Sequence, residues 1–90
     1  LLKHASICKE SSKAIEELFR KSGFPEGVFQ HLEVSYQEIE DLIANPLVKG
    51  VSLTGSDVTG RKIASLAGQN IKKSLLELGG NDAFIRVPEI

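Results

Sequence analysis

The sequence predicts an α/β fold of the doubly wound class, in which helices flank a mainly parallel sheet. Two observations carry this prediction: short apolar segments alternate along the chain with amphipathic segments of about a dozen residues, the pattern of right-handed crossover units, and the composition, 41% hydrophobic and 26% charged, is that of an ordinary globular protein. Ninety residues form one small domain at most, with a modest core.

The first two elements are a strand and a helix. Residues 1–5 have the composition of a short strand, and residues 11–23 have the period of an amphipathic helix. Gly23 stands where a helix C-terminus favours glycine. The expected apolar stripe of this helix consists of Ala14, Ile15, Leu18 and Phe19.

A turn, a strand and a second helix follow. In the turn "GFPEG", Pro25 fixes one dihedral and Gly27 is free to take a positive φ, so the chain is expected to resume as a strand over residues 28–34. Ser35 and Glu38 have the spacing of a capping box, which predicts the start of a helix that Asn45 and Pro46 end. Its apolar face is formed by Ile39, Leu42 and Ile43.

The last part of the chain repeats the alternation. Residues 48–55 are predicted as a third strand, residues 56–70 as a helix and residues 72–78 as a fourth strand. Residues 82–87, "DAFIRV", predict a fifth strand. The inward face of the helix is expected to contain Ile63, Leu66 and Ala67.

Charge and cysteine content exclude several functions. Eleven basic and twelve acidic side chains leave a net charge of -1, which does not favour a nucleic acid or an anionic membrane as partner. The single cysteine, Cys8, cannot form an internal disulfide, and no apolar run approaches the length of about 20 residues that spans a bilayer. A cytoplasmic setting is therefore expected. The opening "LLKHA" is typical of the middle of a strand and predicts that these residues come from a longer chain.

The segment "TGSDVTG" is a candidate phosphate site. Gly55 and Ser56 lie where a strand passes into a helix, so free backbone N–H groups and a hydroxyl are expected at a helix N-terminus. Gly60 lies about one turn into that helix and allows a ligand ring or another helix to approach the backbone. The alternative is purely structural, with Ser56 as an N-cap and Gly60 as a packing glycine.

Two charged residues stand at predicted strand ends. Glu77 closes the fourth strand before the pair Gly79 and Gly80, which let the backbone approach a ligand at the edge where doubly wound sheets bind one. An acid in water on an edge strand is the alternative. Lys3, near the end of the first strand, is placed to meet a ribose or a phosphate, or else is simply solvated.

Three reactive residues, Cys8, His4 and His31, receive no chemical role. Cys8 stands at the start of the first helix with only His4 near it in sequence, which does not favour nucleophilic catalysis. His4 and His31 have no metal-like companions in the sequence pattern, so no metal site is predicted.

Four segments together resemble one enzyme family. In order and spacing, "LLKHAS", "GFPEGVF", "VSLTGSDVTG" and "LELGGND" are similar to the aldehyde dehydrogenase superfamily over essentially all ninety residues, and "LLKHA" with "KKSLLELGGNDAFI" resembles its bacterial succinate-semialdehyde dehydrogenase branch. The resemblance implies that residues 1–90 are part of an NAD(P)-binding domain. Its sheet would be a Rossmann-like variant that uses GSxxxG as its glycine motif.

The resemblance also implies residue roles. Lys3 would contact the adenosine ribose or its 2′-phosphate, and Ser6, which stands where NAD-preferring members often carry an acid, slightly favours NADP over NAD. Pro25 and Gly27 would border the adenine pocket, and Glu77 would be the general base, partly buried. The implied cofactor-binding residues are Lys3, Ser6, Pro25, Gly27, Gly55, Ser56, Gly60, Leu78 and Gly79.

In two respects the chain departs from the family. The resemblance places the nucleophilic cysteine beyond Ile90, and Cys8 does not match its position, so no dehydrogenase activity is expected of these ninety residues. The catalytic-cysteine domain and the oligomerisation segment are expected elsewhere in the parent enzyme, which would act on a small aldehyde as a homo-oligomer. A free-standing module that binds a nucleotide or a partner, and an unrelated flavodoxin-like protein, are the alternatives.

Overall fold

The structure, a computed structural model, describes residues 1–89. The chain divides into two compact units, Leu1–Ile39 and the part from Glu40 onward. The predicted α/β class is confirmed, because helices alternate with parallel strand pairs in both units. No helix among the described residues has both the length and the apolar character that a membrane span requires.

The first unit is a strand, helix, strand crossover. It consists of β1 (Leu2–Lys3), a 3₁₀ turn η1 (Ser6–Cys8), α1 (Lys9–Lys21) and β2 (His31–Leu32). The two strands are parallel, and the register pairs Leu2 with His31 and Lys3 with Leu32. Such a register brings the residues that follow both strands to the same end of the pair.

One face of α1 is turned toward the β2 segment. Ser12, which is 1% exposed, lies 2.7 Å through its Oγ from Nδ1 of His31, and Glu16 accepts a hydrogen bond of 3.1 Å from the His31 backbone N–H. One turn further, Phe19 stacks on Phe29 with ring centroids 4.7 Å apart. These positions, spaced by four and three residues, form a single helical stripe.

The stripe predicted for this helix is therefore only partly correct. Phe19 is half-buried, but Ile15 and Leu18 are 39% and 62% exposed and Ala14 is exposed as well. The stripe that meets β2 is rotated toward Ser12 because polar contacts to His31, and not apolar area alone, fix the helix there.

The connections follow the turn and capping signals. Gly23 and Gly27 both have positive φ, 85° and 84°, as the sequence predicted for the end of α1 and for the turn after Pro25. At the start of α2 (Tyr36–Ala44), the Ser35 backbone N–H donates to Glu38 Oε2 at 2.6 Å and the Glu38 N–H donates to Ser35 Oγ at 3.4 Å. The capping box is confirmed.

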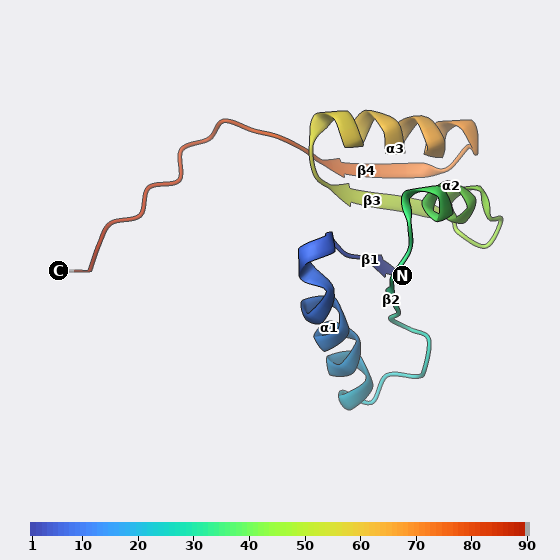
Figure 1. Ribbon diagram of the computed structural model, residues 1–90, viewed down its shortest axis with the longest axis horizontal. Coiled ribbons are helices and arrows are strands. Elements are labelled where there is room, and N and C mark those ends of the chain that lie inside the picture. The colour runs from blue at the N-terminus through green and yellow to red at the C-terminus, as the bar shows by residue number, and fades with distance from the viewer. Residues whose placement is uncertain (90) are drawn as a thin grey trace. The chain divides into compact units, whose positions relative to one another are not determined.

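The second unit is also a crossover. It contains β3 (Gly50–Thr54), α3 (Asp57–Gln69) and β4 (Lys73–Glu77), and α3 lies along the parallel strand pair (Figure 1). The register runs from Gly50 opposite Lys73 to Thr54 opposite Glu77. Its buried apolar side chains are Ile43 of α2 with Ile63 and Ala67 of α3, and Leu66 is half-buried, so the predicted inward faces are confirmed.

The predicted fifth strand is wrong. Residues 78–89 form neither helix nor strand, and Phe84, Ile85 and Val87 are 95%, 82% and 76% exposed. A strand needs a neighbour that supplies its ladder of hydrogen bonds. Among the described residues β4 pairs with β3, and nothing pairs with residues 82–87.

Candidate functional site

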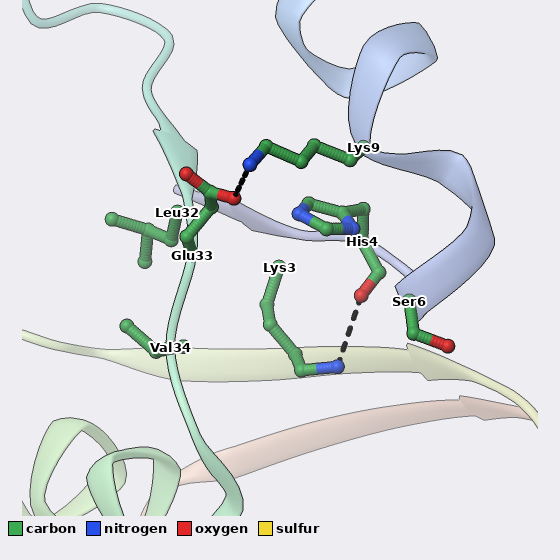
Figure 2. A pocket seen from close by; sticks show the side chains of 7 residues that line it. All are labelled: Lys3, His4, Ser6, Lys9, Leu32, Glu33 and Val34. Atoms are coloured by element: carbon green, nitrogen blue, oxygen red, sulfur yellow. Dashed lines mark hydrogen bonds and ion pairs between the residues drawn. The ribbon is translucent and has the colours of Figure 1, made fainter.

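A pocket in the first unit contains two of the predicted cofactor residues. It has a volume of about 320 Å³ and lies at the end of β1 and β2 and the start of α1 (Figure 2). Its lining consists of Lys3, His4, Ser6, Lys9, Leu32, Glu33 and Val34, a set called here the Lys3 pocket. The parallel register brings the ends of β1 and β2 together: Lys3 is opposite Leu32, so the residues after both strands leave the pair at the same end.

The charges of the Lys3 pocket leave one cation uncompensated. Lys9 forms an ion pair with Glu33, which lowers the pKa of the Glu33 carboxyl and raises that of the Lys9 ammonium. The Lys3 ammonium donates to the His4 carbonyl oxygen at 2.9 Å, and no carboxylate within residues 1–89 forms an ion pair with it. The pocket thus presents the Lys3 charge beside the small neutral Ser6, an arrangement suited to an anion.

The predicted residues Pro25 and Gly27 are not part of the Lys3 pocket. Both belong to the exposed turn between α1 and β2, where the Val28 N–H donates to the Pro25 carbonyl oxygen at 3.3 Å. The structure therefore brings Lys3 and Ser6 together and leaves these two residues outside their pocket.

In the second unit, the "TGSDVTG" segment forms the expected strand-to-helix turn. Ser56 is the N-cap of α3, and its Oγ accepts from the Thr59 N–H at 3.2 Å. The Gly55 N–H is not free, contrary to the prediction, because it donates to the Glu77 carbonyl oxygen at 3.0 Å. The amides at the first turn of α3 remain the anion-favouring end of the helix.

Gly60 makes a close packing contact. A Cβ added at Gly60 would lie 2.5 Å from Leu78 Cδ2 and 2.8 Å from Leu78 Cδ1. The group that approaches the Gly60 backbone in this structure is thus the Leu78 side chain. The contacts of the structural alternative are therefore present: Ser56 is an N-cap and Gly60 is a packing glycine.

The candidate base Glu77 closes β4 opposite Thr54, and its side chain is exposed. Partial burial was expected and is not found, since Glu77 is exposed. Just beyond, the Gly79 N–H donates to Asp57 Oδ1 at 3.2 Å, which ties the glycine pair to the first turn of α3. Backbone and side-chain contacts thus join the end of β4 and the residues after it to the N-terminal part of α3.

Sequence reasoning missed three polar residues and a histidine pair. Asp57, Lys9 and Glu33 take part in the contacts above, and the expectation that the histidines have no metal-like companions is wrong: ligand atoms of His4, His31 and Glu33 all lie within 4.8 Å of one another. An acid in a helix's first turn was the available signal for Asp57. Lys9, Glu33 and the histidines become neighbours only through the β1–β2 register, which the sequence does not show. Cys8 is exposed.

Comparisons with known proteins converge on one family. The sequence model described as "Aldehyde dehydrogenase family" matches residues 1–89. The chain is 49% identical over 85 residues to succinate-semialdehyde dehydrogenase [NADP(+)] of Deinococcus radiodurans and 47% identical over 88 residues to an aldehyde dehydrogenase of Paenarthrobacter nicotinovorans. These alignments include 94% and 98% of this chain.

A solved structure agrees. The crystal structure of succinic semialdehyde dehydrogenase from Streptococcus pyogenes in complex with NADP+ superimposes with a TM-score of 0.88 at 49% identity and covers 92% of this chain. The chain spans 18% of that protein, and 18% and 19% of the two relatives above.

Proposed function

This chain belongs to the aldehyde dehydrogenase family, and we propose that it is part of the NADP-binding domain of an enzyme that oxidises succinate semialdehyde to the carboxylic acid. The observation that carries the cofactor part is the Lys3 pocket, where an unpaired ammonium stands beside Ser6. The substrate part rests on the names of the similar proteins.

The residues of the Lys3 pocket fit the adenosine end of NADP. Lys3 would bind a 2′-phosphate as a point charge, and Ser6, which lacks a negative charge, would not repel it. Glu33 also lines this pocket, but Lys9 neutralises it. Pro25 and Gly27 would border the adenine, as the family resemblance implies.

In the second unit, the first turn of α3 with Gly55 and Ser56 would bind the pyrophosphate. Gly60, Leu78 and Gly79 would border the cofactor, which when bound accepts a hydride. Glu77 would take a proton from water through its carboxylate oxygens, and its exposure leaves it open to solvent.

The ninety residues alone are proposed to be catalytically inactive. Covalent catalysis on an aldehyde needs an activated nucleophile. Cys8 is the N-cap residue of α1, and the family resemblance places the nucleophile elsewhere. We also propose a cytoplasmic setting for the parent enzyme.

A matched pair of ligands tests cofactor choice. Adenosine 2′,5′-bisphosphate and AMP differ by the 2′-phosphate, and NMR titration of the chain should show tighter binding of the bisphosphate. Lys3→Gln should remove most of that difference and Ser6→Glu should reverse it, while Lys21→Gln, at the far end of α1 about 18 Å along the helix, should leave it unchanged. Equal binding of both ligands, or no effect of Lys3→Gln, would contradict the proposal.

A chimera tests the enzymatic part. Residues 1–89 would replace the matching segment of the Streptococcus pyogenes enzyme, and turnover would be measured with succinate semialdehyde and NADP. We expect an active chimera that Glu77→Gln disables, whereas the matched change Glu89→Gln does not. An active, folded chimera in which Glu77→Gln keeps full turnover would reject Glu77 as the base, and the isolated chain should show no turnover.

Self-association is the remaining part of the proposal. Apolar side chains that are more than three-quarters exposed occur in both units, namely Ile7, Leu47, Val58, Ile71, Phe84, Ile85 and Val87. Apolar surface of this kind favours association with another copy, as in a homo-oligomeric parent, or with a different partner. Light scattering should report a dimer or larger species, and a monomer at high concentration would contradict it.

A further inference from the structure

We propose that His4, His31 and Glu33 form a binding site for a divalent transition-metal ion of the zinc class. The three side chains come from adjacent positions of the β1–β2 pair: His4 follows β1, His31 opens β2 and Glu33 follows it. Two imidazole nitrogens and one carboxylate are a ligand set that zinc uses where it keeps an open position. The proposal does not rest on the cofactor site.

The two histidine rings lie close together, and each has a contact at Nδ1. They stack with centroids 5.0 Å apart and planes 12° from parallel. His4 Nδ1 lies 2.6 Å from the Ala5 carbonyl oxygen, which can only accept, so Nδ1 donates and the Nε2 of the neutral ring carries the lone pair. His31 Nδ1 lies 2.7 Å from the oxygen of the buried Ser12. Such contacts at the second nitrogen orient metal-binding imidazoles.

The other two nitrogens lack partners. His4 Nε2 and His31 Nε2 are both buried without a hydrogen bond in the described part of the chain. Buried polar atoms are nearly always paired, so two unpartnered nitrogens on two neighbouring rings require an explanation. A bound cation would satisfy both lone pairs at once.

The third ligand is the Glu33 carboxylate, whose side chain is exposed enough to change position. Figure 2 shows the Glu33 carboxylate joined to Lys9 next to the His4 ring. A glutamate carboxylate is charged at neutral pH, so Glu33 offers an anionic oxygen. Ligand atoms of a tetrahedral zinc lie about 3.4 Å apart, and the ligand atoms of this group all lie within 4.8 Å of one another. Glu33 is half-exposed, so its carboxylate has room to move toward the histidines when it leaves Lys9.

Lys9 therefore competes with the metal for Glu33, which makes a sharp test possible. The chain would be titrated with Co²⁺ and followed through its ligand-field absorption, with Zn²⁺ as competitor. We expect one ion per chain. His4→Gln, His31→Gln and Glu33→Gln should each weaken binding at least about tenfold, and Lys9→Gln should tighten it, while Glu26→Gln, an exposed acid of the turn, should have no effect.

Two further measurements keep the result independent of folding defects. Long-range ¹⁵N NMR of the unaltered chain should show Zn²⁺ shifting Nε2 of both histidines, with Nδ1 still protonated. Cys8→Ser should leave binding intact, since the exposed thiol is outside the proposed ligand set. No saturable binding, binding lost with Cys8→Ser, or binding unaffected by Lys9→Gln would overturn the proposal.

Discussion

The Leu78 side chain lies directly over the Gly60 α carbon, where a Cβ would come within 2.5 Å of Leu78 Cδ2. The contact joins the first part of α3 to the residue that follows β4. It gives Gly60 a structural reason to be glycine that involves no cofactor.

A double-mutant cycle separates packing from ligand binding at Gly60. Gly60→Ala alone should gain little stability, because the helix propensity of alanine, about 0.5 to 1 kcal/mol better than glycine, is offset by moving Leu78. In a Leu78→Ala background the obstacle is absent, so Gly60→Ala should stabilise by that amount. Urea unfolding measures the coupling between the two sites. Additive effects would show that the contact has no energetic weight.

Ser56→Ala should destabilise the second unit by about 1 kcal/mol, the usual cost of removing an N-cap side chain. The reason is the loss of the acceptor for the Thr59 N–H. Thermal unfolding followed by circular dichroism would measure the change. Ser65→Ala on the exposed side of α3 is the control and should change stability far less. An equal loss in both variants would mean that Ser56 does not cap the helix.

The capping box of α2 should make stability depend on pH. Hydrogen bonds from Ser35 lower the pKa of Glu38 in the folded chain below its ordinary value of 4.5. A carboxyl with a depressed pKa contributes stability above 4.5, and the contribution is lost as the pH falls through the folded value. The melting temperatures of the wild type and Glu38→Ala should thus differ more at about pH 6 than at about pH 3. A constant gap would contradict this.

Ile71→Gly should stabilise the chain. Ile71 has a φ of 54° and is 95% exposed in the turn between α3 and β4, so its branched side chain contributes strain and little burial. The left-handed conformation costs a non-glycine residue about 1 to 2 kcal/mol, and glycine's own entropy offsets part of that. A net gain near 1 kcal/mol in urea unfolding is expected. As a comparison, Gly68→Ala adds a Cβ that meets no other atom and so reports the effect of helix propensity alone. A loss of stability in Ile71→Gly would refute the strain interpretation.

The sequence predicted what depends on local signals. Helix periods, the Ser35–Glu38 box and the two positive-φ glycines concern residues a few positions apart, and the structure has them. The fifth strand was wrong because a strand depends on a partner, and none of the described residues pairs with residues 82–87.

The residues of the Lys3 pocket also divide into those that a local sequence signal identifies and those that only the fold brings together. Lys3 and Ser6 could be identified from a short motif, and the structure places them in one pocket. Lys9 and Glu33 are 24 positions apart and meet only because β1 and β2 are parallel in one register. His4 and His31 became neighbours for the same reason, so no local pattern could reveal their stacking.

The hydrogen bond from the Gly55 N–H to the Glu77 carbonyl oxygen is made by the main chain on both sides. Side-chain replacement at either position leaves both partners in place, except for proline at Gly55, which would remove the donor. This hydrogen bond therefore fixes the distance between the backbone at Ser56, the N-cap of α3, and the backbone at Glu77, whichever side chains surround them. Changes to the surrounding side chains can therefore alter what this end of the strand pair binds while the backbone geometry between the two elements stays the same.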